Sequence, residues 1–459
     1  MLEQFLQDLP QGLLWGVIGA IVFGLLGLVS GTDETATITP LTLLVVLLGV
    51  PPVGVYAFFI AAVVSKHMTH AVPTMLLGIP GDTMAIPLLE EADRLRRLGV
   101  PHIALRKAIS GGFIAALIAV PVSVAVAGLL SPLAHAISTA APWIFLVATV
   151  VIAYFSPARL GGVVALVPFV LLILGLQAFT KTHDTKLTIV YFLGIAVGPL
   201  VVDLFNILTP AGRESSRRDG KETYHLSRPN DRSHRYLPNP FRVLDKRQVA
   251  WTGAASAVSA STFVFSPIAM TVLMGEAVKR FPKNAYHRLT STIAVKNGTT
   301  ESTYLGETLI PLVAFGLPLS PMSAGPAAPL YNAPPRFTVD AESGTVNNLH
   351  TYLSSWEFLV FGLLGVLLAG IVVYPLAMRY AAAAASFIMR KVGQETVIAA
   401  FVSLILMVAV WEGGLLGVLV TVTVALVGGL LTRFLKIHAG VQFMGYYVAI
   451  LTVPAILAL

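Results

Sequence analysis

Acidic and hydroxyl side chains interrupt a long apolar stretch near the amino terminus. The segment 31–37, Gly-Thr-Asp-Glu-Thr-Ala-Thr, lies between two apolar runs. A charge at the centre of a bilayer costs at least about 2.5 kcal/mol, so charged groups in such runs usually face a cavity and a partner. We therefore expect Asp33 and Glu34 to bind a cation or a proton, and Thr35 and Thr37 to contact a substrate. An exposed loop between two helices is the alternative interpretation.

A second polar group follows at 66–70, Lys-His-Met-Thr-His. His67 and His70 can share a helix face, as a pair of metal ligands would. No third ligand is evident nearby, so we expect no metal site. Histidine suits proton coupling or substrate contact better, and a pair of interfacial histidines is the alternative. The turn at 78–83 can offer backbone amides to an anion, with a helix amino terminus behind it. The expected substrate contacts in this turn are Pro80, Gly81, Asp82 and Thr83.

A third polar group lies in the second half of the chain, at 296–304, Lys-Asn-Gly-Thr-Thr-Glu-Ser-Thr-Tyr. Glu301 belongs to it, and Glu307 follows just before an apolar run. We expect both acids to take part in cation or proton coupling, with Glu307 the better candidate for a buried acid. The expected substrate contacts of this half are Asn297, Thr299, Ser302, Pro318 and Ser320.

Two of these groups adjoin a pattern that occurs twice. Residues 72–80 and 310–318 both have an aliphatic residue and proline, four further residues, then glycine, an aliphatic residue and proline. Two prolines and a glycine within nine residues oppose a regular helix. Interrupted apolar segments at matching places in two halves are the best sequence indication of a transporter's binding site.

Composition restricts the class of protein. Of 459 residues, 56% are hydrophobic and 12% charged, and the mean hydropathy is +0.81. Soluble domains carry about 25% charged residues, so the composition predicts an all-α polytopic membrane protein. Cysteine is absent, which excludes disulfides, thiolate nucleophiles and cysteine-ligated metals. Nucleotide-binding and hydrolase motifs are also absent, so we expect neither ATP-driven transport, nor an enzyme, nor a cofactor other than a coupling H⁺ or Na⁺.

Charge divides the chain in two. The net charge is +7, which we assign to basic cytoplasmic loops rather than to nucleic-acid binding. Residues 213–247 carry ten Lys and Arg against five Asp and Glu. We interpret them as a cytoplasmic linker, with a regulatory or lipid-headgroup role as the alternative. The linker separates an amino-terminal membrane repeat, 1–212, from a carboxy-terminal one, 248–459. Nearly equal halves with a shared pattern favour an internal duplication.

The apolar segments predict about 10–12 transmembrane segments. Residues 248–278 are broken at Ser266-Pro267 into arms too short to cross, and basic residues flank both ends. A re-entrant helical hairpin fits this pattern. The broken region 11–50 lacks basic flanks and would open to the other side, which is typical of inverted-topology repeats. The amphipathic segment 90–105 is predicted to be a surface helix with solvated charges. The regular apolar segments of spanning length lie near 108–130, 133–155, 159–178, 186–210, 357–377, 396–411, 414–432 and 440–459.

At three places the sequence resembles the large membrane permease subunit of the tripartite tricarboxylate transporter family. These are 27–37, 71–81 and 308–318, whose order and spacing cover most of the chain. Ser30 and Asp33 replace a proline and a glycine of the family pattern, and 298–302 replaces its Glu-Ala-Ala-Asn-Asn run. The resemblance implies carboxylate uptake by cation symport with a periplasmic solute-binding protein and a small membrane subunit. The departures allow a divergent branch that works without those partners.

These observations together predict a secondary active transporter in a bacterial or archaeal cytoplasmic (inner) membrane. It would take up a small organic anion, similar to a di- or tricarboxylate, with H⁺ or Na⁺ by alternating access. The sequence leaves a homodimer open. An intramembrane enzyme that acts on a lipid-linked substrate, and a channel, are the alternatives.

Overall fold

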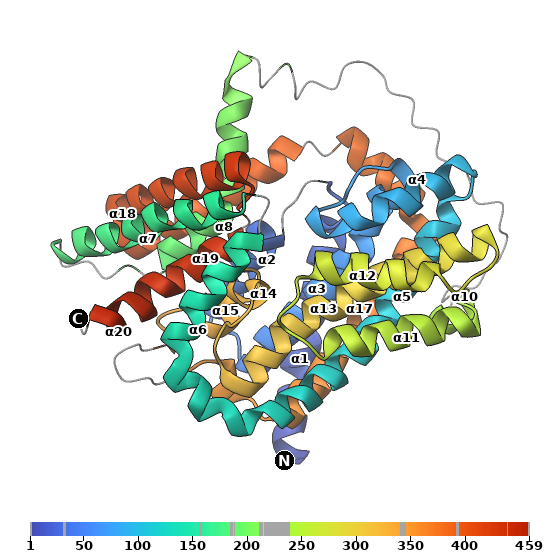
Figure 1. Ribbon diagram of the computed structural model, residues 1–459, viewed down its shortest axis with the longest axis horizontal. Coiled ribbons are helices and arrows are strands. Elements are labelled where there is room, and N and C mark those ends of the chain that lie inside the picture. Colours follow the sequence, from blue (N-terminus) through green and yellow to red (C-terminus); the bar gives the residue numbers. More distant parts are fainter. Residues whose placement is uncertain are drawn as a thin grey trace.

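The computed structural model describes residues 2–30, 34–155, 158–183, 187, 189–210, 214, 239–339, 346–391, 394–437 and 439–457. Regular structure in these residues is helical (Figure 1), apart from one two-stranded antiparallel ribbon. The elements of the first half are α1 (Leu2–Leu26), α2 (Glu34–Leu47), α3 (Pro52–Leu77), the 3₁₀ helix η1 (Thr83–Leu88), α4 (Leu89–Arg97), α5 (Pro101–Leu130), the 3₁₀ helix η2 (Ser131–Leu133), α6 (Ala134–Phe155), α7 (Leu160–Lys181) and α8 (Ile189–Leu208). Those of the second half are α10 (Pro240–Val243), α11 (Lys246–Ala260), α12 (Pro267–Lys279), α13 (Ala285–Phe315), α14 (Pro321–Ala324), α15 (Ala328–Tyr331), β1 (Thr338–Val339), β2 (Val346–Asn347), α16 (Leu349–Tyr352), α17 (Ser355–Lys391), α18 (Gln394–Leu435), α19 (Ala439–Tyr447), the π-helical turn η3 (Val448–Thr452) and α20 (Val453–Leu457).

Seven of the described helical stretches are long and apolar enough to cross a bilayer. This confirms the prediction of an all-α polytopic membrane protein. Three shorter apolar helices accompany them. The seven are Phe5–Leu26, Pro52–Leu77, Pro101–Ile137, Leu160–Lys181, Ser355–Ile388, Ala399–Leu435 and Ala439–Ile456.

Two long helices, α3 and α13, form the buried centre. The last 25 residues of α3 are buried from Val53 to Leu77, and α13 is buried from Thr290 onward. The two halves interlock around this centre. Helix α5 of the first half packs along α13, and α17 of the second half packs along α3. Helices α1 and α2 complete the cover of α3, and α11 and α12 that of α13.

The repeated proline and glycine pattern ends α3 and α13 in the same way. Gly78 and Gly316 adopt left-handed φ values of 73° and 65° and cap their helices. Their amides donate to the carbonyls of Pro73 and of Pro311 and Leu312. The prediction of a broken helix was therefore wrong at the first proline of each copy. Each helix continues through that proline, because in a buried helix neighbouring elements compensate for the missing N–H, and it stops at the glycine.

The predicted break near Ser266 is confirmed. Helices α11 and α12, of 15 and 13 residues, form a hairpin that packs on α13 (Figure 1). At 1.5 Å per residue the arms span roughly 22 and 20 Å, less than the roughly 30 Å of a bilayer core. Ser266 caps α12 by accepting the amide of Ala269. The broken region 11–50 of the first half has arms of unequal length, because α1 is long enough to cross a bilayer and α2 is not.

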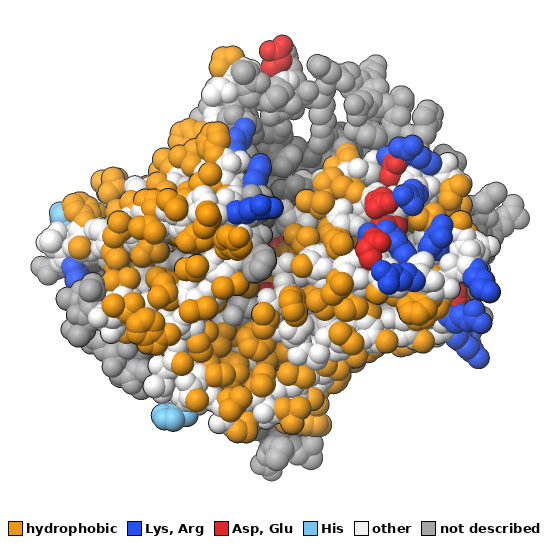
Figure 2. All heavy atoms as spheres, in the orientation of Figure 1, with side chains coloured by type: hydrophobic (Ala, Val, Ile, Leu, Met, Phe, Trp, Pro, Cys, Tyr) orange, Lys and Arg blue, Asp and Glu red, His pale blue; other side chains and the backbone are white. Residues whose placement is uncertain are grey.

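Charge and apolarity separate on the molecular surface. Figure 2 shows hydrophobic side chains over most of the visible face, whereas charged side chains gather over α4 and the ends of α10 and α12. Exposed apolar residues include Trp411 and Leu415 on α18 and Leu160 and Val164 on α7. Such a belt is appropriate for contact with lipid.

Close packing of α5 on α13 allows a first prediction. A Cβ on Gly111 would meet the backbone of Ala294, whereas a Cβ on Gly128 of the same helix would meet nothing within 4 Å. Gly111→Ala should destabilise the protein by about 1–3 kcal/mol, because the two backbones must separate. Gly128→Ala is the matched control and should leave stability unchanged or slightly higher. Thermal unfolding in detergent measures both, and equal midpoints would contradict the close approach.

Candidate functional site

His67 of α3 lies between two carboxylates that come from different halves of the chain. Its Nε2 is 2.6 Å from Glu34 Oε1, at the start of α2. Its Nδ1 is 2.8 Å from Glu301 Oε2 on α13. All three side chains are almost fully buried. We call Glu34, His67 and Glu301 the His67 trio.

The two contacts of His67 define how many protons the trio holds. A neutral imidazole donates from one ring nitrogen and accepts at the other, whereas an imidazolium donates from both. Two ring nitrogens that each face a carboxylate oxygen therefore require an imidazolium, or a neutral ring with one protonated carboxyl group. In either case the trio carries one proton more than a neutral imidazole between two carboxylates would. Without that added proton, a lone pair of one ring nitrogen would face a lone pair of a carboxylate oxygen at less than 3 Å.

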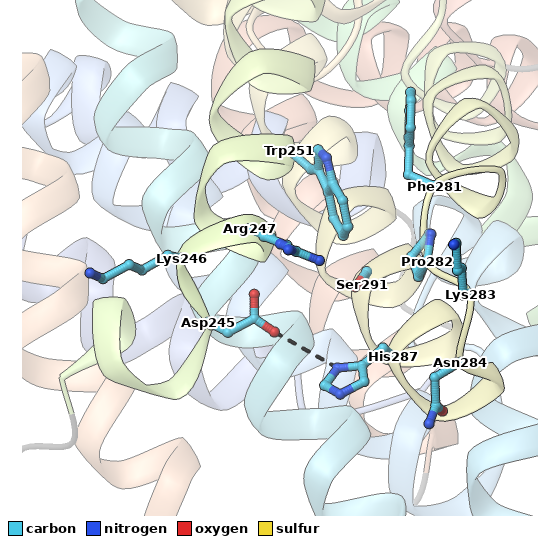
Figure 3. Close-up of a pocket in the computed structure, with 10 residues that line it drawn as sticks. All are labelled: Asp245, Lys246, Arg247, Trp251, Phe281, Pro282, Lys283, Asn284, His287 and Ser291. Carbon is cyan, nitrogen blue, oxygen red and sulfur yellow. Dashed lines mark ion pairs between the residues drawn. The ribbon is translucent and has the colours of Figure 1, made fainter.

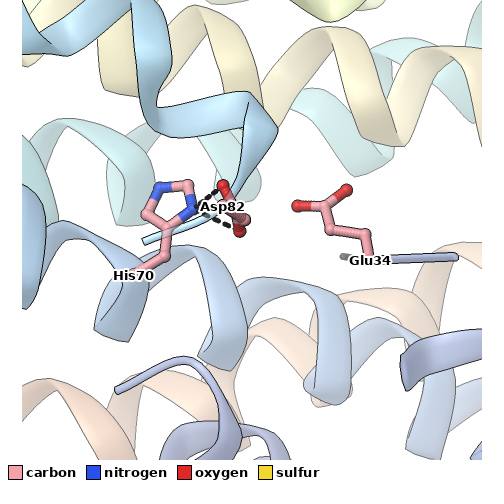
Figure 4. A group of neighbouring side chains, drawn as sticks. All are labelled: Glu34, His70 and Asp82. Atoms are coloured by element: carbon pink, nitrogen blue, oxygen red, sulfur yellow. Dashed lines mark hydrogen bonds and ion pairs between the residues drawn. The ribbon is translucent and has the colours of Figure 1, made fainter. Parts of the chain in front are cut away.

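His70, one turn further along α3, has a separate acid partner. Its Nδ1 is 2.9 Å from both carboxylate oxygens of Asp82, as Figure 4 shows. Its Nε2 is 3.4 Å from Oδ1 of Asn297. The Asp82 side chain also accepts the amide of Ala85 at the start of η1, and Lys66 Nζ is 3.8 Å from it. This second pair therefore connects α3, η1 and α13.

Three of these groups could bring ligand atoms to one metal ion. Atoms of Glu34, His70 and Asp82 lie within 4.8 Å of one another, and Figure 4 shows the carboxylate of Glu34 directed toward Asp82. The surroundings do not fit a divalent ion. Asp82 and His70 already bind each other. Lys66 also brings an ammonium group close to Asp82, and the positive charge of this ammonium repels a nearby cation.

Glu307 lies in a second polar region at the end of α13. Its Oε2 accepts the amide of Met322 at 3.4 Å, and its backbone carbonyl accepts the hydroxyls of Ser320 and Ser323. Its Oε1 has no hydrogen-bond partner among the described residues. Helix α2 reaches this region, because Thr39 donates to the carbonyl of Gly325 at 3.2 Å.

The expected substrate contacts do not all face the His67 trio. Among the described residues, the buried hydroxyls of Thr35, Thr83 and Thr299 have no hydrogen-bond partner, so each can donate to a ligand. Ser302 instead faces α11, where its hydroxyl is 2.6 Å from that of Ser259. Ser320 caps α14.

The turn after Gly78 uses several of its polar groups internally. Gly81 donates its amide to the Thr74 hydroxyl at 3.1 Å, and the Pro80 carbonyl accepts the Ser30 hydroxyl at 2.6 Å. The Gly78 amide is bonded within its helix end. The amides of Gly78 and Gly81, which the sequence suggested for an anion, are therefore already bonded within the protein. Of the other predicted site residues, Thr37 donates its hydroxyl to the Glu34 carbonyl at 3.4 Å. Pro318 is buried before α14. Asp33 lies outside the described residues.

Sequence patterns did not predict the cluster of ion pairs that Glu91 forms with Lys279 and Lys296. Glu91 is 1% exposed, so the prediction that the charges of 90–105 are solvated is wrong at this residue, whereas Arg94 and Arg97 are exposed as predicted. Its Oε2 is 2.6 Å from Nζ of Lys296 and its Oε1 is 2.9 Å from Nζ of Lys279. Partial burial alone would lower the pKa of Lys279, but hydrogen bonds to Glu276 and Glu91 raise it above its ordinary value. These ion pairs hold α4 against α12 and α13.

The long apolar helices and the buried polar centre define a multi-pass membrane protein with a polar site inside its helical core. Comparison with protein families agrees: the model of the tripartite tricarboxylate transporter TctA family matches residues 13–439. The chain belongs to this family, which makes it a component of a tricarboxylate transporter and indicates a transporter rather than an enzyme. No curated protein and no solved structure matches it significantly.

Proposed function

We propose that the protein is the permease of a secondary transporter that takes up a small di- or tricarboxylate together with protons. The observation that carries the proposal is the His67 trio. Its imidazole bridges Glu34 and Glu301 through both nitrogens inside the protein. Glu34 Oε2 and Glu301 Oε1 have no hydrogen-bond partner among the described residues.

The trio connects protonation to the position of α2. Glu34 begins α2, and its bond to His67 is one of the contacts that hold this short helix against the centre. With the exchangeable proton bound, α2 is attached to α3 and, through His67, to α13. Loss of the proton weakens one of the two hydrogen bonds that His67 forms with Glu34 and Glu301. The proton thus biases an equilibrium between two arrangements of α2, which is what coupling requires.

Alternating access would follow from two inverted repeats. The equivalent ends of α3 and α13, with proline, a left-handed glycine and a side-chain cap at Asp82 or Ser320 four residues later, support a duplication. So does the reciprocal packing of α5 on α13 and α17 on α3. In this proposal the hairpin α11–α12 is re-entrant from the cytoplasm, and substrate binds between the halves.

Substrate carboxylates require donors, and α2, η1 and α13 supply them. The hydroxyls of Thr35, Thr83 and Thr299 would donate to the anion, and Lys66 would contribute positive charge near Asp82. A periplasmic solute-binding protein would deliver the substrate, and a small membrane subunit would assist, as the family's tripartite description suggests. The membrane would be a bacterial or archaeal inner membrane.

Uptake into sealed vesicles tests the proposal. Radiolabelled citrate is the probe, with membrane vesicles that contain this chain alone or with the two accessory subunits. Citrate should accumulate when a pH gradient, alkaline inside, is imposed, and a protonophore should abolish accumulation. Accumulation driven by Na⁺ alone would contradict proton coupling. Movement that only equilibrates citrate under every gradient would favour a channel.

A further inference from the structure

A cavity of about 520 Å³ lies where α11 begins, α12 ends and α13 begins. It is separate from the His67 trio and opens at the charged end of the molecule. Figure 3 shows the rings of Trp251 and Phe281 on one side and Asp245, His287 and Asn284 on the other, with Ser291 between them. Ligand pockets usually measure about 300–1,000 Å³, so the cavity is large enough for a headgroup.

Unpaired positive charge lines this cavity. Lys246, Arg247 and Lys283 belong to its wall, and none of them forms an ion pair with a described residue. Figure 3 shows Arg247 directed toward the centre of the group and Lys246 directed away. Asp245, the carboxylate of the wall, already accepts the amide of Gln248 at 2.8 Å and lies 3.9 Å from Nδ1 of His287. The cavity therefore has an excess of positive charge that an anion would neutralise.

The walls of the cavity combine this charge with a lipid-facing surface. Trp251 and Phe281 stack with their centroids 6.0 Å apart, and Phe281 is 63% exposed. Exposed aromatic rings such as these are enriched at membrane–water interfaces. Further along the same hairpin, Val258, Val272 and Leu273 are exposed and can contact acyl chains. A free anion would use only the charged end of this surface.

We propose that the cavity binds the phosphate of an anionic phospholipid, with Arg247 and Lys283 holding the phosphate and the rings of Trp251 and Phe281 flanking the glycerol backbone. An Arg guanidinium fits phosphate in a bidentate geometry, and basic pockets between helices on the cytoplasmic side suit lipid headgroups. Inorganic phosphate shares the headgroup chemistry but lacks the acyl chains. The site is additional to the proposed transport site, although Ser291 on its wall lies on the same helix as Asn297 and Glu301.

Ligand-dependent thermal stability of the purified full chain tests this site. The probes are short-chain phosphatidylglycerol, short-chain phosphatidylcholine and inorganic phosphate at equal concentrations in detergent. Phosphatidylglycerol should raise the unfolding temperature of the unaltered protein, and the other two should not. In the double variant Arg247→Gln/Lys283→Gln, the apparent affinity for phosphatidylglycerol should fall by about 30-fold, because two cations near the headgroup are lost.

The control keeps the same change of charge on another surface. Arg94→Gln/Arg97→Gln removes two exposed cations of α4 and should retain the response to phosphatidylglycerol. The charge-preserving variant Arg247→Lys/Lys283→Arg should retain it too, which separates charge from folding defects. A response that survives in the Gln double variant, or an equal response to phosphatidylcholine, would overturn the proposal. An equal shift with inorganic phosphate would overturn the lipid assignment.

Discussion

Replacing His67 by glutamine should lower proton-driven citrate uptake by about 10- to 100-fold, because a hydrogen bond to a charged group contributes about 1.5–3 kcal/mol. Glutamine can donate its amide to one of the two acids, and its carbonyl oxygen can face the other acid only when that acid is protonated. It cannot carry a ring proton to either acid. The affinity of the variant for citrate should fall less than its rate of citrate accumulation. Initial uptake rates at several external pH values measure the effect, and the pH dependence of the rate should flatten.

The control for this variant is another histidine of the chain. His350 of α16 is half-buried and its Nδ1 is 3.1 Å from the carbonyl of Val313, outside the His67 trio. His350→Gln should leave the pH dependence of uptake as in the unaltered protein. If His67→Gln accumulates citrate normally in response to a pH gradient, the trio is not the coupling site.

Lys296→Met should destabilise the protein by about 3 kcal/mol. The Lys296 side chain is 4% exposed and that of Glu91 is 1% exposed, so the variant leaves a buried carboxylate with one of its two lysines missing. Removing one member of a buried pair typically costs about 3–5 kcal/mol, and we expect the lower value because Lys279 remains. Thermal or denaturant unfolding in detergent measures the change.

The companion double variant isolates the cause of that loss. Glu91→Gln/Lys296→Met removes both charges and should recover most of the stability, since an uncompensated buried charge is the main cost. Arg94→Met, on the exposed side of α4, should change stability by less than about 1 kcal/mol. If the double variant is as unstable as Lys296→Met, the loss comes from packing of the lysine stem against Gly275 and not from the ion pair.

Local sequence features predicted part of this structure. The break near Ser266 was predictable because Ser-Pro opens a helix, and the glycine caps of α3 and α13 because glycine tolerates a left-handed backbone. Glu307 was predicted as a buried acid because it precedes an apolar run, and its side chain is buried. The family resemblance at three segments was confirmed across residues 13–439.

Long-range pairing could not be predicted from local patterns. His67 and Glu301 are 234 residues apart, and no periodicity connects them. Ser302 follows Glu301, yet the two side chains face different neighbours because successive residues on a helix differ by about 100° in direction. Glu91 belongs to a strongly amphipathic segment, so its sequence gives no sign that Lys296 and Lys279 enclose it.

The separation of His67 from its second acid has a consequence for biogenesis. Translation at about 5–20 residues per second makes the chain between His67 and Glu301, 234 residues, in roughly 12–47 s. During that time α3 exists with Lys66, His67 and His70 before α13 has been synthesised. Such a helix is costly to leave among lipid tails. We therefore expect the newly made first half to stay beside the insertion machinery until the second half has been made, so that the same buried polar groups would also set the order of assembly.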